Sequence, residues 1–69
     1  MEIFAERLKN LRKERRWSSK EMAEYLEVSQ RAYLYYESGT NYPNIPGLIK
    51  LADYFGVTTD YLLGRTDER

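Results

Sequence analysis

The chain has 69 residues, 42% of them hydrophobic, with a formal net charge of zero. That is enough apolar material for a small core and too much for a disordered chain. The absence of cysteine and histidine excludes disulfides and thiolate metal sites and removes the commonest general base and metal ligand. We therefore expect no enzyme, metal or cofactor. With no apolar run of roughly 18 residues and no signal peptide, we expect no membrane partner and a cytoplasmic location.

The charge is unevenly distributed. Seven basic residues and one acid lie between residues 7 and 20, whereas three basic and five acidic residues lie between 36 and 69. The seven basic residues are Arg7, Lys9, Arg12, Lys13, Arg15, Arg16 and Lys20. Because phosphate contacts depend on the local patch, this segment suits a nucleic-acid partner despite the zero net charge. An ordinary solvated helix face remains an alternative.

The pattern predicts five helices and no strand, starting with a helix over about 2–15. Phe4, Leu8, Leu11 and Arg15 share one stripe at helical spacing. This stripe is expected to face the core.

Two short helices joined by a tight turn are predicted over about 18–38. Ser18 followed by Glu21 is a capping box, and Ser29 opens the second helix, which runs to about Ser38. Within the second helix, Tyr33 and Tyr36 are expected to face inward. A pair of this kind is typical of a helix-turn-helix, whose second helix is presented to a DNA major groove.

The fourth helix is predicted to start at Asn44 and to stop at Gly56. It would bury Leu48, Leu51, Ala52 and Phe55. The fifth would run from Thr58 to Gly64, and the polar tail 65–69 is expected to fray. The whole chain, 1–69, is thus predicted to form one all-α domain.

Three segments carry a resemblance to a known family: LKNLRKER, WSSKEMAEYLEVSQRAYLYYESG and PNIPGLIKLADYFGVTTDYLLG. With them the chain resembles the lambda-repressor-like helix-turn-helix family, the Xre or Cro type of phage repressors and small bacterial regulators. The resemblance covers about residues 3–64. It implies a compact five-helix all-α domain that binds double-stranded operator DNA and regulates transcription, commonly as a homodimer.

Carried over by position, the recognition helix is the segment of about 29–38. The implied base-contacting residues are Gln30, Arg31, Leu34 and Tyr35. The amide of Gln30 suits adenine and the guanidinium of Arg31 suits guanine. Leu34 would meet a thymine methyl or mark a protein-binding patch.

The implied phosphate contacts lie on both flanks of this helix, at Ser19, Lys20, Ser38, Asn41 and Tyr42. The family often has glutamine at the position of Ser19, and the shorter serine is not expected to brace the recognition helix. The resemblance also implies a structural ion pair between Arg12 and Glu37. Glu27 stands where the family usually has glycine, so a left-handed turn there would be strained by about 1 kcal/mol.

Two function classes follow. The first is a sequence-specific DNA-binding transcriptional regulator of the repressor type. The alternative is a protein-interaction module on the same fold, such as an antirepressor, an antitoxin or an oligomerisation domain. A homodimer interface is expected at Tyr61, Leu62 and Leu63, because these residues give the short last helix more apolar surface than we expect one small domain to bury.

Overall fold

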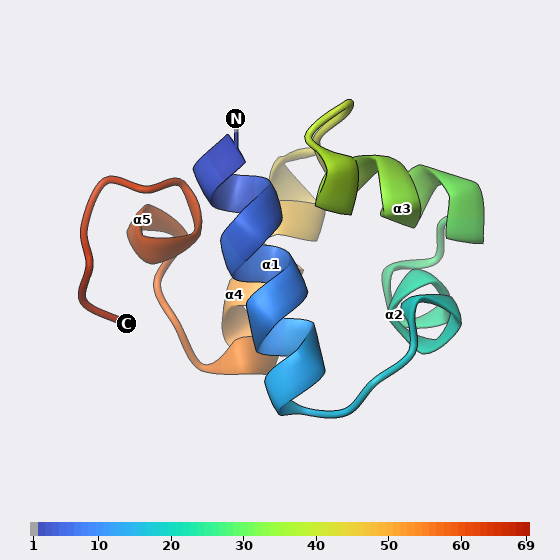
Figure 1. Ribbon diagram of the computed structural model, residues 1–69, viewed down its shortest axis with the longest axis horizontal. Helices are drawn as coiled ribbons and strands as arrows, with labels where there is room; N and C mark the ends of the chain where they lie inside the picture. The colour runs from blue at the N-terminus through green and yellow to red at the C-terminus, as the bar shows by residue number, and fades with distance from the viewer. Residues whose placement is uncertain (1) are drawn as a thin grey trace.

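The computed structural model describes residues 2–69. These residues contain five α-helices and no strand. In chain order the helices are α1 (Glu2–Glu14), α2 (Ser19–Leu26), α3 (Gln30–Ser38), α4 (Ile45–Phe55) and α5 (Thr59–Leu62). Figure 1 shows α1 across the middle of the molecule and α4 behind it. In the same view α2 and α3 lie on one side of α1, and α5 with the C-terminal segment lies on the other. The predicted all-α, five-helix fold is confirmed.

The helix starts follow local capping chemistry. The hydroxyl of Ser29 accepts a hydrogen bond from the Ala32 amide, and the Asn44 side chain accepts one from the Gly47 amide. Thr58 caps α5 in the same way through the amide of Tyr61. These side chains satisfy backbone N–H groups that the first turn of a helix leaves unpaired, so short polar residues set where each helix begins.

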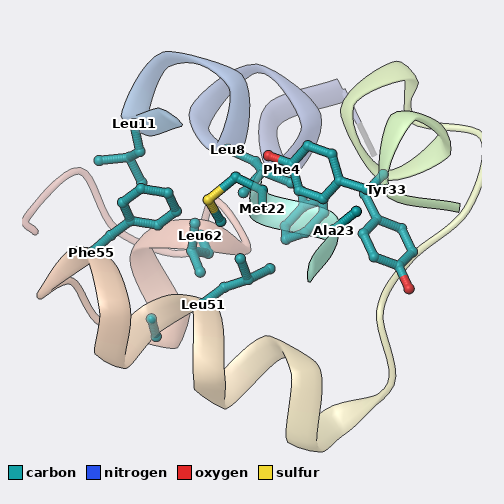
Figure 2. Packing of buried hydrophobic residues seen from close by; sticks show 11 residues of the cluster. Phe4, Leu8, Leu11, Met22, Ala23, Tyr33, Leu51, Phe55 and Leu62 are labelled. Atoms are coloured by element: carbon teal, nitrogen blue, oxygen red, sulfur yellow. The ribbon is translucent and has the colours of Figure 1, made fainter. Parts of the chain in front are cut away.

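The core forms where all five helices meet (Figure 2). Leu8, Met22, Tyr33, Leu51 and Leu62 lose essentially all solvent exposure there. They come from five different helices, so no helix pair encloses the core alone. The inward orientation predicted for Tyr33 and Tyr36 is confirmed.

Arg15 departs from the predicted inner stripe. Arg15 is exposed to solvent, although its guanidinium donates to the Phe55 carbonyl oxygen at 3.3 Å and lies over the Tyr54 ring. Because α1 ends at Glu14, its last buried residue is Leu11, one turn before Arg15. A long cationic side chain can cover apolar surface while its charge stays near water.

The tail 65–69, which its composition predicts to fray, contacts α1 in the structure. Arg7 donates to the carbonyl oxygens of Tyr61 and Thr66, and its guanidinium pairs with Asp67 at 2.7 Å. The Arg69 guanidinium makes two hydrogen bonds to the Glu14 carboxylate, at 2.6 and 3.0 Å. Composition alone did not show that α1 supplies charged partners for Asp67 and Arg69.

Candidate nucleic-acid interface

Helix α3 lies at the edge of the molecule and presents one face to solvent (Figure 1). Its predecessor α2 starts with the predicted capping box. The Ser18 hydroxyl accepts from the Glu21 amide, and the Glu21 carboxylate accepts from the Ser18 amide. The backbone hydrogen bond from Ser18 lowers the pKa of Glu21 below its ordinary value. The box therefore keeps its negative charge at the positive end of α2.

Glu27 closes α2 in the left-handed conformation, with φ 58° and ψ 41°. This is the strained turn that the departure from glycine predicts. Helix α3 starts three residues later, so the turn fixes the direction in which it leaves α2.

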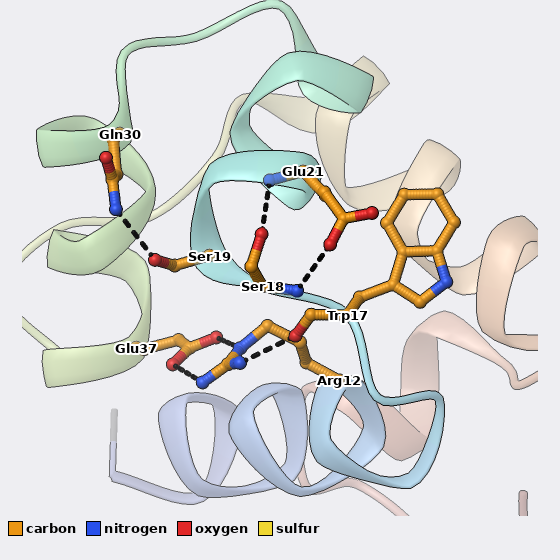
Figure 3. A network of polar contacts seen from close by, with 7 residues as sticks. All are labelled: Arg12, Trp17, Ser18, Ser19, Glu21, Gln30 and Glu37. Atoms are coloured by element: carbon orange, nitrogen blue, oxygen red, sulfur yellow. Dashed lines mark hydrogen bonds and ion pairs between the residues drawn. The ribbon is translucent and has the colours of Figure 1, made fainter.

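An ion pair anchors the far end of α3 to α1 (Figure 3). The Arg12 guanidinium donates to the Glu37 carboxylate at 2.6 and 3.1 Å and to the Trp17 carbonyl oxygen at 2.8 Å. The Glu37 side chain is only 7% exposed, and its hydrogen bond raises the pKa of Arg12. The pair thus ties α3, α1 and the start of the helix-turn-helix together, which gives Glu37 a structural role.

The start of α3 is braced against α2 by a bond that we did not expect. The Gln30 side-chain amide donates to the Ser19 hydroxyl at 3.0 Å (Figure 3). Serine was expected to be too short to brace the recognition helix, and that expectation is wrong because Gln30 supplies the length from the other side. Within residues 2–69, the Gln30 amide keeps its carbonyl oxygen and one N–H available, and these are the two groups that can read adenine.

The residues expected to contact bases share the outer face of α3. Gln30 and Arg31 are exposed, Leu34 is 45% exposed and Tyr35 is 41% exposed. Arg31 makes no hydrogen bond or ion pair with any described residue, so its guanidinium is available to a partner. The structure brings all four side chains to one accessible surface.

The expected phosphate contacts fare differently on the two flanks. Lys20 is exposed and unpaired within the described residues, and the Ser19 hydroxyl accepts from Gln30 and keeps its own proton for donation. On the other flank, the Ser38 hydroxyl donates to the Tyr35 carbonyl oxygen and is joined to Thr40 at 2.8 Å. The α2 flank is thus better prepared for a phosphate.

The loop after α3 is shaped by its own side chains. The Asn41 side-chain oxygen accepts from the Tyr42 amide, which leaves its NH₂ group as a donor that makes no hydrogen bond among the described residues. The Tyr42 ring packs edge-on against the Phe4 ring, with 6.1 Å between the ring centres. Thr40, which we did not predict, belongs to this loop through its bond to Ser38. Its place in the polar run SGTN is the only signal that pointed to it.

The basic segment contributes less to the surface than its composition suggests. Arg7, Arg12 and Arg15 are used inside the molecule, as described above. The side chains of Lys9, Lys13, Arg16 and Lys20 are exposed and make no hydrogen bond or ion pair with any residue from 2 to 69. Four cations therefore remain available to an anionic partner.

The predicted dimer residues do not form one exposed surface. Leu62 is 0% exposed and lies in the core, so it is corrected from an interface residue to a core residue. Tyr61 is half-buried beneath the Arg7 guanidinium, which lies 4.1 Å from the ring centre. Leu63 is half-buried and lines an apolar groove together with Phe4, Tyr42, Pro43 and Leu48. Two of the three residues are therefore partly available to a second copy, and one is not.

Residues 2–69 lack two features that would point to other functions. Those residues contain no cluster of three or more acidic side chains placed to hold a metal ion. Within the same part of the chain, no helix is both long enough and apolar enough to cross a membrane.

Two helices joined by a left-handed turn, the second with one face exposed to solvent, define a helix-turn-helix domain. Residues 5–68 match the protein family described as "Helix-turn-helix domain", and the chain belongs to this family. The resemblance to Xre-type regulators is confirmed by the relatives that follow.

The chain is 41% identical over 64 residues to the HTH-type transcriptional regulator AnsR of Bacillus subtilis (strain 168), covering 93% of this chain and 55% of AnsR. It is 40% identical over 65 residues to the cryptic phage CTXphi transcriptional repressor RstR of Vibrio cholerae, covering 91% of this chain and 58% of RstR. A crystal structure of a transcriptional regulator from Listeria innocua superposes with a TM-score of 0.87 at 42% identity, covering 96% of this chain and 62% of that one. The chain thus spans between 55% and 62% of the length of these three proteins.

Proposed function

We propose that this chain is the DNA-binding part of a transcriptional regulator and that it binds a specific sequence of double-stranded DNA. The observation that carries the proposal is the outer face of α3, on which the Gln30 amide is held by Ser19 with its reading groups available. Arg31 stands beside it as an unpaired guanidinium among the described residues. Such a regulator acts where its operator lies, so a cytoplasmic location accompanies the proposal.

In this proposal α3 enters the major groove, and the start of α2 contacts the phosphate backbone. Ser19 and Lys20 lie in the first turn of α2, where backbone N–H groups and the helix dipole favour a negative charge. The Asn41 side chain supplies a donor beyond the other end of α3. Contacts to phosphates position the protein on the duplex, whereas Gln30 and Arg31 supply the sequence preference.

The test is selection of bound duplexes from a random pool at low and at higher salt. We expect a consensus sequence that survives the higher salt, because base-edge contacts are less salt-dependent than phosphate contacts. Weak binding without any consensus would contradict the proposal.

A matched pair of variants separates base reading from charge. Arg31→Ala is expected to weaken binding to the consensus by about 1–3 kcal/mol. Arg31→Lys retains the charge but loses the planar fork, so it should keep most of the salt dependence and lose preference at one base pair. Equal preference in the parent protein and Arg31→Lys would argue that Arg31 contacts only phosphate.

We further propose that the protein binds DNA as a homodimer, through a surface centred on α4. The exposed apolar side chains Tyr42, Ile45 and Ile49 form what we call the α4 apolar surface, with exposed fractions of 47%, 74% and 48%. Leu63 lies at the groove beside it. Exposed apolar side chains gathered in this way are typical of a protein interface.

Sedimentation velocity of Ile45→Asp tests the dimer. An acid in the first turn favours a helix, so the variant is expected to fold while losing the apolar contact. We expect the dimer of the parent protein to become a monomer, and the selected DNA to change from a palindrome bound cooperatively to a half-site bound weakly. Leu34→Ala is the control and should leave the oligomeric state unchanged. A monomeric parent protein would overturn this proposal.

A further inference from the structure

The outer face of α3 has an apolar side chain at its centre. At about 100° per residue, Leu34 projects between Gln30 and Arg31, one turn further along the helix. Ser38 follows on the same side, and Tyr35 stands at the margin. Polar groups that can bind base edges therefore surround one leucine that cannot form a hydrogen bond.

Leu34 is not accounted for by packing within the molecule. It is 45% exposed, whereas Tyr33 and Tyr36 on the opposite side of α3 are at most 8% exposed. The helix is already held at both ends, by the Ser19 bond to Gln30 and by the Arg12 pair with Glu37. Leu34 is thus presented outward by a helix that does not need it for its own placement.

The size of the patch decides what kind of partner fits it. Leu34 and Tyr35 are the only large apolar side chains exposed on α3 among the described residues, and Gln30, Arg31 and Ser38 surround them with polar groups. A stable protein interface takes about 800 Å² from each partner, much more than two side chains offer. The α4 apolar surface differs because it continues into the apolar groove that Leu63 lines. A single leucine instead matches one apolar group within an otherwise polar partner.

The major groove contains one such group. The C5-methyl of thymine is the only apolar group that the four bases present there, beside donors and acceptors on every base pair. Facing any other base edge, Leu34 would leave a donor or acceptor without a partner, which is unfavourable. The same side chain thus both favours thymine and disfavours the other bases.

We propose that Leu34 is a specificity-determining residue that contacts the C5-methyl of a thymine in the half-site, within about two base pairs of the one read by Gln30. This inference rests on the proposed function. Four residues of α3 separate the two side chains by about 6 Å along the helix axis, which is a little under two base-pair steps of about 3.4 Å, so they address base pairs within about two steps of each other.

The experiment replaces thymines by uracil, one at a time, in the duplex recovered by selection. Uracil differs from thymine only by the missing methyl, so base pairing is retained. We expect one position per half-site at which the dissociation constant rises about fourfold, the effect of one buried methyl. The other thymines should tolerate the change.

Leu34 variants then assign that position. In Leu34→Ala the parent duplex should bind more weakly, and the uracil substitution should have no further effect. Leu34→Met keeps an apolar side chain of similar size and should retain the sensitivity. Gln30→Ala is the matched control: it weakens binding and leaves the methyl effect at fourfold.

The outcomes are distinguishable. A uracil effect that persists unchanged in Leu34→Ala, or the absence of any sensitive thymine, overturns this inference and leaves the proposed function standing. The same holds if Leu34→Ala binds DNA like the parent protein, since the leucine then serves another partner. If no duplex is bound even at low salt, the proposed function fails and the inference fails with it.

Discussion

Arg12 is the most heavily bonded side chain around the helix-turn-helix, with two hydrogen bonds to Glu37 and one to the Trp17 carbonyl oxygen. Arg12→Met would leave the Glu37 carboxylate, 7% exposed, without its partner. We expect this to lower the free energy of unfolding in urea by about 3–5 kcal/mol. The double variant Arg12→Met/Glu37→Met removes both charges and should be more stable than the single variant. Losses that simply add would show that the pair is not coupled.

Tyr33 carries a buried hydroxyl that has no hydrogen-bond partner among the described residues. Burial raises the pKa of Tyr33, and the Glu37 carboxylate raises it further. That carboxylate accepts hydrogen bonds from Arg12 and none from the Tyr33 hydroxyl. The hydroxyl thus neither reaches solvent nor finds a partner among the described residues.

Tyr33→Phe is therefore expected to raise the free energy of unfolding by about 1 kcal/mol, because it removes an unsatisfied polar group without removing the ring. Urea denaturation measures the change, with Tyr36→Phe as the control that should bring no gain. A loss of stability in Tyr33→Phe would mean that the hydroxyl is bonded after all.

At the scale of the element, the turn between α2 and α3 is held in a conformation that its sequence does not favour. Glu27 has φ 58°, and its carboxylate lies at the negative end of α2. Glu27→Gly should raise the free energy of unfolding by about 1 kcal/mol, since glycine adopts this conformation without strain.

The control lies one turn earlier. Glu24→Gly sits inside α2, where glycine lowers helix stability by about 1 kcal/mol. Opposite signs for the two variants, measured by thermal or urea unfolding, would separate backbone strain from the mere loss of a glutamate. A destabilised Glu27→Gly would show that the left-handed turn is not strained.

At the scale of the whole molecule, the tail and α1 form an electrostatic clasp that depends on pH. The hydrogen bonds from Arg69 lower the pKa of Glu14 below its ordinary value. A carboxylate with a lowered folded-state pKa contributes stability above its unfolded pKa and loses it as the pH falls through the folded value. The clasp is therefore intact at neutral pH and opens on acidification through the lowered pKa of Glu14, below the ordinary range of a glutamate.

Glu14→Gln and Arg69→Gln should each reduce the loss of stability between pH 6 and 3, and the double variant should behave like either single one. Hydrogen exchange of the Arg65 amide, which is bonded to Asp60, reports the release of the tail directly. A pH dependence that is the same in all three variants and the parent protein would show that the clasp does not form in solution. Glu21, whose pKa is also lowered, adds acid sensitivity of the same sign that these variants leave in place.

The sequence alone determined which elements form and where they begin. Ser18, Ser29 and Asn44 cap their helices as predicted because capping is a local interaction between a side chain and the next turn of its own backbone. The helical spacing of apolar residues likewise predicted the core faces of α1, α3 and α4. Family resemblance added the expectation that the face of α3 carrying Gln30 and Arg31 binds DNA.

Only the tertiary structure decided how side chains far apart in the sequence meet. The bond from Gln30 to Ser19, the clasp of the tail on α1 and the burial of Leu62 each depend on where separate helices are placed. A charge count could not show that Arg7, Arg12 and Arg15 are used internally, because an ion pair depends on distance in space. The local sequence pattern decides the secondary structure of each segment. Long-range packing decides which of its side chains remain available to a partner.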